Sequence, residues 1–498
     1  MKPPKAFPLG SNPSLDDLAA VAGGRRVSFD PPAKKRVAAS RARLVKATAT
    51  GRAIYGVNTG FAELASRRIP NDQLQTLQRN LVLSHSCGVG PLLEEAEARA
   101  LVFLRANELA RGWSGVRPEL VALMAAVVNS GVVPAIPSRG SLGASGDLAQ
   151  QAHAALFLIG EGFGLRRGKK LPAADLLKRA GLKPVVLEAK EGLALLNGTQ
   201  AMQAVGGLAL RRARFVLEAA QLAGAMSLEA MTGTPGPFDA RLHALKPHPG
   251  QVACARGLRE LLAGSEIRKS HIENDPRVQD PYSLRCMPQV HGTVLDALSN
   301  SQKTVLVELR SVSDNPVFVG DAALSGGNFH GQALSFAYDS AAIALTALSG
   351  IAERRVFQLI LGAAPKLNIY LAKNPGLESG WMIPQYVAAA LASENKTLAH
   401  PASADSIPSS ANKEDFVSMG MWSALKFKQI VFNTAQVVAI ELLCAAEGVE
   451  VHRPLKPGRG VAQGLRRLRE RVAPARGDES FSARMELVRG MILEGAFS

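Results

Sequence analysis

The sequence predicts a mainly α-helical protein with small β elements near its loops. Three observations lead to this fold class. Hydrophobic residues make up 47% of the 498 residues, which is enough for a large core. Only 5% of the residues are aromatic, so this core is built mostly from Ala, Leu and Val, which favours closely packed helices. Beyond residue 200, long stretches also carry apolar residues at helical spacing.

The first 200 residues predict short helices separated by loops. Segments 55–61 and 134–146 contain several residues that break helices, so both are expected to be loops. The sequence GEGFG at 160–164 is similar to a nucleotide-binding turn, but it follows a predicted helix instead of a strand, so we interpret it as a helix end. Helices are expected at 16–22, 32–49, 71–86, 93–111, 117–130 and 148–159.

Beyond residue 200 the pattern is overwhelmingly helical. Several of these helices are apolar on more than one face, which indicates burial inside a bundle or between subunits. Because there is no internal repeat and no low-complexity linker, we expect one unit over 1–498, with a loop-rich part at 1–200, a central long-helix bundle at 201–450 and a basic tail at 451–498. The long helices are expected at 200–231, 287–312, 329–361, 384–399 and 418–446.

Charge and cysteine content argue against several classes of function. The net charge is +16, but the basic residues are scattered and their short runs lack interleaved aromatics, so no nucleic-acid partner is expected. The four cysteines are widely spaced and form no CxxC motif, which fits a reducing compartment and predicts no metal site. No apolar stretch approaches the roughly 18 uninterrupted residues that span a bilayer, and the N-terminus lacks an apolar signal core. We therefore expect a cytoplasmic protein without a membrane segment.

The glycine-rich segment GSLGASGDL at 140–148 is a candidate for unusual chemistry. Three glycines within seven residues permit backbone conformations that a Cβ atom forbids. The helix predicted to follow has an N-terminus that favours negative charge nearby. Taken alone, however, these residues favour an ordinary glycine-rich turn capped by Ser145 or Asp147.

Eight sequence blocks, which together extend over almost the whole chain, resemble the histidine/phenylalanine ammonia-lyase family. Because all eight occur in the family's order, chance agreement is negligible. The resemblance implies a long-helix bundle of the ammonia-lyase/fumarase-like type. The blocks are YGVNTGF at 55–61, NLVLSHSCGVG at 80–90, GSLGASGDLA at 140–149, LALLNGTQ at 193–200, QDPYSLRC at 279–286, SDNP at 313–316, GGNFHG at 326–331 and SENKTLAHPASADSIPSSANKEDFVSMG at 393–420.

The resemblance implies that the chain makes its own electrophile. Ala144, Ser145 and Gly146 would cyclise autocatalytically into a methylidene-imidazolone, with loss of two waters. No ordinary side chain is an electrophile, and an α-amino group leaves poorly until it is bonded to one. The implied substrate is an amino acid, bound as a free small molecule, and no metal or nucleotide cofactor is implied.

The same resemblance implies roles for further residues. Tyr55 matches the base that removes the β-proton, a role that requires a lowered phenol pKa or a transient tyrosinate. Arg285 matches the anchor of the substrate carboxylate, which a planar guanidinium binds with two hydrogen bonds. Tyr282 and Glu414 match further catalytic positions. The substrate-binding positions are matched by His85, Asn197, Gln279, Asn315 and Phe329.

Substrate specificity depends on Ser84, His85 and Glu414, which resemble the histidine-specific members. Phenylalanine-selective relatives tend to carry Phe-Leu in place of Ser-His, and tyrosine-selective relatives tend to carry His-Leu. An imidazole offers a donor and an acceptor, so a histidine and a carboxylate are suitable partners for it. The sequence thus predicts deamination of histidine to urocanate. Some tyrosine aminomutases also carry Ser-His, so the alternative is a tyrosine or other aromatic ammonia-lyase, or a 2,3-aminomutase, with the same electrophile.

The chain departs from the family pattern near the site. Gln150 and Gln151 replace Pro-Leu after the electrophile, and Ala62 replaces a Gly in the lid segment. Lys413 replaces the usual Gln before Glu414, where pairing would leave that carboxylate already satisfied. None of these departures affects the residues expected to carry the covalent chemistry.

The resemblance also implies a homotetramer in which active sites are shared between chains. Two other functions were weighed against the lyase. A serine hydrolase using Ser145 and His153 would lack the GxSxG elbow and an evident acid partner. A non-catalytic binding protein would not need the intact Ala-Ser-Gly sequence and both tyrosines.

Overall fold

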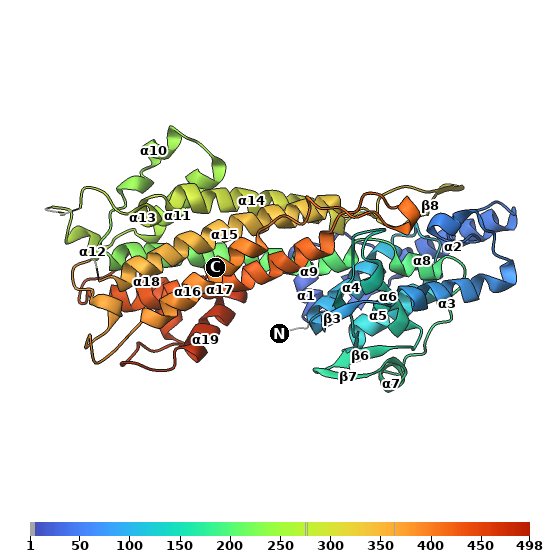
Figure 1. Cartoon of the computed structure of the whole chain (residues 1–498), viewed down its shortest axis with the longest axis horizontal. Coiled ribbons are helices and arrows are strands. Elements are labelled where there is room, and N and C mark those ends of the chain that lie inside the picture. Colours follow the sequence, from blue (N-terminus) through green and yellow to red (C-terminus); the bar gives the residue numbers. More distant parts are fainter. Residues whose placement is uncertain (1–4, 274, 276, 363) are drawn as a thin grey trace. The chain divides into compact units, whose positions relative to one another are not determined.

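The computed structural model describes residues 5–273, 275, 277–362 and 364–498, without the side chain of Ala62. The chain is 59% helical with a few small sheets, so the mainly α fold class is confirmed (Figure 1). It divides into two compact units, each built from three separate stretches of sequence. The first unit is Met1–Leu208, Lys303–Tyr338 and Pro401–Leu425, and the second is Ala209–Gln302, Asp339–His400 and Lys426–Ser498.

The first unit contains all the strands in the described part of the chain. Its sheets are small: β1 pairs with β2 in parallel, while β3–β5, β4–β6–β7 and β8–β9 are antiparallel. Strand β5 leads directly into the glycine-rich segment, so these small sheets support the loops, as expected. The strands are β1 Phe7–Pro8, β2 Val27–Ser28, β3 Val89–Leu92, β4 Val133–Pro134, β5 Pro137–Arg139, β6 Phe163–Arg166, β7 Lys169–Pro172, β8 Val317–Val319 and β9 Ala322–Leu324.

Short helices surround these strands, and their ends follow local sequence signals. Ser14 caps α1 by accepting a hydrogen bond from the Asp17 backbone, and Gly131 ends α5 with a positive φ. Helix α4 is buried over most of its length, so it lies at the centre of this unit. The short helices of the first unit are α1 Leu15–Ala22, α2 Pro31–Ala49, α3 Leu74–His85, α4 Glu95–Leu109, α5 Pro118–Ser130, α6 Leu148–Leu158, α7 Ala173–Arg179 and α8 Glu191–Leu196.

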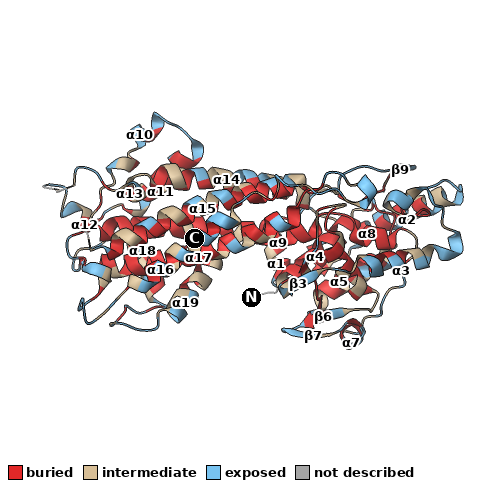
Figure 2. Cartoon of the chain, viewed as in Figure 1, coloured by how far each residue is buried: buried red, intermediate tan, exposed pale blue. Residues whose placement is uncertain are grey.

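Four long helices each begin or end in the first unit and continue into the second: α9 Gln200–Ala230, α14 Met287–Leu309, α15 Gln332–Ile360 and α17 Gly420–Glu450. Within the second unit, one buried polar cluster connects them. Arg355 of α15 bonds Glu441 of α17 and also contacts His291 of α14. Ser227 of α9 donates to the same glutamate at 2.9 Å. The predicted long helices are thus present, and Figure 2 shows how much of their surface is buried.

Helices α15 and α17 are long and apolar enough to cross a membrane, judged by length and composition alone. Their most apolar 18-residue windows have mean hydropathies of 1.3 and 1.5. Within the protein, 56% and 89% of these windows are buried. Core helices of water-soluble proteins meet the same criterion, so these two helices do not by themselves indicate a membrane.

The C-terminal region 451–498, predicted from the sequence as a basic tail, contains regular secondary structure. These residues form two helices, α18 Arg459–Arg469 and α19 Ser482–Leu493. Helix α18 buries Val461, Gly464 and Leu468, while Arg459 and Arg466 are exposed. The excess of basic residues was the basis for predicting a tail, whereas the i, i+3, i+7 spacing of the buried positions is typical of a helix. The remaining helices of the second unit are α10 Ala240–Ala244, α11 Pro249–Leu261, α12 Glu266–Lys269, α13 Tyr282–Arg285 and α16 Met382–Leu398.

Candidate active site

A cavity of about 370 Å³ in the first unit brings together most of the residues singled out from the sequence. They come from the 55–61 loop, the end of α3, the glycine-rich turn, the end of α8 and three later loops. Gly146 lies just behind, on a neighbouring cavity of about 240 Å³ that shares part of the same wall. The singled-out residues that line the larger cavity are Tyr55, His85, Ala144, Ser145, Asn197, Asn315, Phe329 and Glu414.

The Ala144-Ser145-Gly146 segment is a tight turn that accepts only glycine at its last position. Ser145 has a φ of 49° and Gly146 a φ of 83°, both in the left-handed region. A Cβ atom on Gly146 would lie 2.0 Å from the Gly198 carbonyl oxygen. The backbone therefore already bends sharply between Ala144 and Gly146, whose atoms the expected cyclisation would join. These residues fit the electrophile that the resemblance implies.

Glu414 lies beside the serine of this turn. The Ser145 hydroxyl donates to Glu414 Oε1 at 3.3 Å, while Ser409 and Ser410 each donate to Oε2 at 2.9 Å. The backbone around Ser410 is held in left-handed conformations, with φ of 50° there and 51° at Ala411. Such conformations are rare for residues other than glycine and cluster at functional sites. The strained loop fixes one oxygen of Glu414 and points the other at Ser145.

Asp147 follows the turn and is fully buried. Its carboxylate accepts from the Met202 backbone at 2.8 Å and from the Ser141 hydroxyl at 3.2 Å. Burial, only partly opposed by these hydrogen bonds, raises the pKa of the Asp147 carboxyl to about 7. The side chain thereby connects the start of α9 to the glycine-rich segment.

His85 ends α3 and faces the cavity from the opposite side. Its Nδ1 lies 3.0 Å from the Ser84 hydroxyl. Burial lowers the pKa of the His85 imidazole, and the Leu81 carbonyl and Glu414 oppose this only in part. A neutral imidazole has one donor nitrogen and one acceptor nitrogen, so His85 offers either kind of partner to a ligand.

Tyr55 is held by a loop that folds back on itself. Asn58 accepts from the Ile54 backbone at 2.8 Å and donates to the Arg52 carbonyl at 2.9 Å. The Tyr55 ring packs edge-on against Phe61, with ring centres 6.4 Å apart. Its half-buried position leaves the ring on the cavity wall while its backbone stays fixed.

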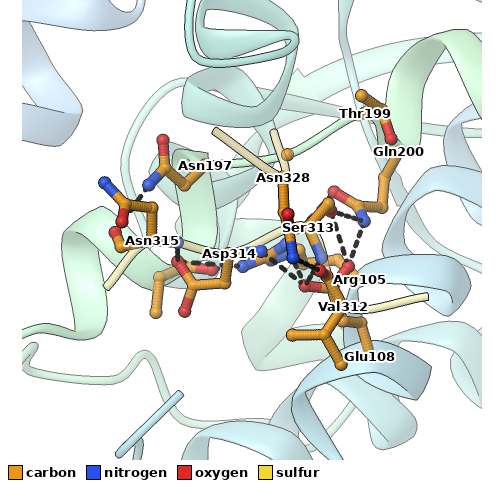
Figure 3. Close-up of polar contacts among 12 residues, drawn as sticks. Arg105, Glu108, Asn197, Thr199, Gln200, Val312, Ser313, Asp314, Asn315 and Asn328 are labelled. Carbon is orange, nitrogen blue, oxygen red and sulfur yellow. Dashed lines mark hydrogen bonds and ion pairs between the residues drawn. The ribbon is translucent and has the colours of Figure 1, made fainter. Parts of the chain in front are cut away.

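Asn197 and Asn315 meet at one carbonyl group (Figure 3). The Asn197 amide donates to the Asn315 carbonyl at 2.7 Å, and Lys190 donates to the same oxygen at 3.0 Å. The Asn315 side-chain oxygen accepts from the Gly326 backbone at 2.9 Å. The two asparagine side chains are therefore oriented by main-chain groups of neighbouring loops.

A buried ion network lies behind these asparagines. Lys190 binds Asp314 at 2.8 Å, and both side chains are inaccessible to solvent. Glu108 of α4 accepts from the backbones of Ser313 at 2.9 Å and Asp314 at 3.0 Å, and Arg105 is 3.3 Å from Glu108. Burial raises the pKa of Glu108 and lowers that of Lys190. These charged groups hold the 313–315 segment in place. Arg105, Glu108 and Lys190 were not among the site residues predicted from the sequence.

Removing one partner of this network should destabilise the protein strongly. We expect Lys190→Met to lower the free energy of unfolding by about 3–5 kcal/mol, because buried Asp314 would lose its 2.8 Å ion pair and keep the longer, 3.8 Å ion pair with Arg105. The exposed pair of Lys46 and Asp321 provides the matched control, and Lys46→Met should cost only ~0–1 kcal/mol. Urea unfolding of both variants measures the difference. Equal, small losses would show that the network does not support the 313–315 segment.

Gln279, Tyr282 and Arg285 belong to the second unit and are not among the described residues that line the cavity. The Tyr282 side chain is 71% exposed, and the Arg285 guanidinium stacks 4.5 Å above its ring. Arg285 Nε is buried and has no hydrogen-bond partner among the described residues. Tyr282 and Arg285 thus form a stacked pair on α13, and Gln279 is an exposed residue of the loop before that helix.

Comparison with known proteins identifies the family of this chain. A family model for aromatic amino acid lyases matches residues 14–470. A histidine ammonia-lyase from Myxococcus xanthus is 48% identical, covering 99% of this chain and 98% of its own. The solved structure of a tyrosine aminomutase from Streptomyces globisporus is 36% identical, with a TM-score of 0.93, covering 99% of this chain and 98% of its own. That of a histidine ammonia-lyase from Trypanosoma cruzi is 38% identical, with a TM-score of 0.91, covering 99% and 94%. The chain therefore belongs to the aromatic amino acid lyase family and is an ammonia-lyase, an enzyme that breaks a carbon–nitrogen bond.

Proposed function

We propose that this enzyme deaminates L-histidine to urocanate and ammonia, using a methylidene-imidazolone formed from Ala144, Ser145 and Gly146. The observation that carries the proposal is the placement of His85 and Glu414 on the same cavity as Ser145, with Glu414 bonded to the serine hydroxyl. Relatives about half identical over nearly the full chain are named histidine ammonia-lyases, which supports the same substrate.

The chain's own residues prepare the electrophile. The left-handed turn at Ser145 and Gly146 bends the backbone, and the Gly198 backbone donates to the Ser145 carbonyl at 3.1 Å, which holds the turn in place. Once formed, the group supplies an electrophilic carbon to which the substrate amine adds, so that the nitrogen becomes a better leaving group. Tyr55, on the wall of the same cavity, is the base that takes the β-proton.

Cyclisation itself would free the carboxylate that recognises the substrate. Glu414 Oε2 accepts hydrogen bonds from Ser409 and Ser410, whereas Oε1 accepts one from the Ser145 hydroxyl. Because the ring loses the Ser145 hydroxyl, Oε1 becomes available to an imidazole N–H. Neutral His85 supplies the complementary partner for the second ring nitrogen.

Selectivity for histidine tests the proposal. A phenyl or phenol ring leaves at least one of His85 and Glu414 unpaired, so kcat/KM for histidine should exceed that for phenylalanine and tyrosine by about 10²- to 10⁴-fold. Replacing Ser84 by Phe and His85 by Leu should lower histidine turnover and reduce this ratio. Wild-type rates on histidine and tyrosine that are within a few-fold of each other would contradict the assignment of histidine.

The second candidate is a tyrosine 2,3-aminomutase or aromatic ammonia-lyase with the same electrophile. The similarity to the solved structure of a tyrosine aminomutase, with a TM-score of 0.93, supports this candidate. The two outcomes differ in their products, because an aminomutase returns a β-amino acid and an ammonia-lyase releases free ammonia.

We further propose that the enzyme is a cytoplasmic homotetramer with shared active sites. Among the residues that the structure describes, Gln279, Tyr282 and Arg285 do not line the cavity and Arg285 Nε has no hydrogen-bond partner, which suits a group completed by another subunit. Exposed apolar side chains on the long helices, such as Val307 at 66% and Phe336 at 65%, offer surface for assembly. Sedimentation of the purified protein tests the tetramer. Mixing Ser145→Ala and Arg285→Ala chains tests the shared sites, because mixed tetramers should regain activity only if each site uses residues of two chains.

Lys413 forms its ion pair with Glu63 and not with Glu414, the carboxylate proposed to recognise the substrate. Its ammonium lies 3.6 Å from Glu63 of the 3-10 segment Ala62–Ser66, and both side chains are mostly exposed. Because an exposed pair contributes little, Lys413→Gln should change kcat/KM for histidine by less than about fivefold. A fall of a hundredfold would show that Lys413 acts on Glu414 or on the substrate.

A further inference from the structure

Gln151 is a fully buried residue on the first turns of α6, where the family pattern has an apolar residue. Its Nε2 donates to two carbonyl oxygens, that of Leu196 at 2.9 Å and that of Gly198 at 2.7 Å. Its Oε1 is buried and has no hydrogen-bond partner among the described residues. Half of this amide is thus used, and both of its donor bonds go to one short segment.

These two carbonyls lie on either side of Asn197. Leu196 is the last residue of α8, so its carbonyl has no partner within the helix and is capped by Gln151. The Gly198 carbonyl also accepts from the Asp147 backbone at 2.8 Å. A side chain and a main-chain group of the same helix therefore hold the segment from both ends.

The segment held in this way packs against the turn that would cyclise. Gly198 and Gly146 form a parallel β-bridge, and the Gly198 backbone donates to the Ser145 carbonyl at 3.1 Å. The two backbones are so close that a Cβ atom on Gly146 would lie 2.0 Å from the Gly198 carbonyl oxygen. A shift of Gly198 is therefore passed directly to Ser145 and Gly146.

We propose that Gln151 is a positioning residue that fixes Asn197 and Gly198 against the Ala144-Ser145-Gly146 turn. It acts on the turn through Gly198 and on the cavity through Asn197, whose amide lines it. Without the two donor bonds, the Gly198 carbonyl loses one of its two hydrogen bonds and the Leu196 carbonyl loses its cap, so ring closure slows and Asn197 loses its alignment. The inference rests on the proposed electrophile and does not depend on which amino acid is the substrate.

The test compares Gln151→Met with Gln150→Met. Methionine keeps the length and shape of glutamine but has no N–H to donate. Gln150 is the matched control, since it is equally buried on the same turn, yet its Nε2 makes only a long 3.4 Å contact with the Pro137 carbonyl on β5. Intact mass measures the fraction of chains that have lost two waters, and steady-state kinetics separates kcat from KM.

We expect the Gln151→Met protein to contain a smaller cyclised fraction than wild type and to lose at least about tenfold in kcat, because small displacements at a reacting centre are costly. KM should change by less than about threefold, and Gln150→Met should match wild type in mass and kcat. A Gln151→Met protein with wild-type cyclisation and kcat, or equal losses in both variants, would overturn the inference. Wild-type protein that has lost no water would instead overturn the proposed electrophile, so the two failures are distinguishable.

Discussion

Ser145→Ala is expected to abolish turnover. The exocyclic carbon of the electrophile derives from the serine side chain, and without a hydroxyl to eliminate no methylidene group forms. The loss should exceed the roughly 10²- to 10⁴-fold that follows removal of a single acid or base. The variant should also keep the waters that wild type loses, which intact mass measures directly.

Ser138 provides the control for this substitution. It is a buried serine on β5, outside the cavity lining, and its hydroxyl has no hydrogen-bond partner among the described residues. Ser138→Ala should therefore retain wild-type mass loss and turnover. A Ser145→Ala enzyme with near-wild-type kcat would refute covalent catalysis by this turn.

Tyr55→Phe is expected to fold normally and to lose about 10²- to 10⁴-fold in kcat. The substitution keeps the ring and its edge-on contact with Phe61, and the loop around it is fixed by Asn58. The cyclised fraction and the melting temperature should stay at wild-type values, which isolates the loss in proton transfer. A variant that keeps most of its kcat would transfer the role of base to Tyr282 or Glu414.

The long helices and the glycine-rich turn were predictable because both depend on local sequence. Apolar spacing predicted the ends of α9, α14, α15 and α17 to within a few residues. Gly143 and Gly146 have positive φ angles, which glycine adopts readily and most other residues do not. Motif blocks that are far apart in sequence supplied most of the cavity wall.

The buried ion network behind Asn197 and Asn315 was not predicted, since it depends on contacts between distant segments. Arg105 and Glu108 lie one helical turn apart, directly after the apolar run at 100–104 of α4, which was the available signal. Charged residues in such a position are rarely buried unless they are paired. Spacing within α4 shows that they share a face, but not that Lys190 and Asp314 meet them there.

The consequence of two departures from the family pattern also required the structure. The sequence left open whether Lys413 pairs with Glu414, and in the structure the Lys413 ammonium instead contacts the Glu63 carboxylate. It identified Gln151 as unusual without indicating a partner, because the Leu196 and Gly198 carbonyls lie 45 and 47 residues away. Side-chain partners at such separations are not encoded by periodicity.

The most direct test of the central claim is a product analysis of wild-type enzyme given L-histidine. The account predicts urocanate and free ammonia in equal amounts, from a protein whose intact mass shows the loss of two waters. L-tyrosine offered under the same conditions should yield far less product. Formation of a β-amino acid without ammonia, or equal turnover of tyrosine, would contradict the claim that this cavity deaminates histidine.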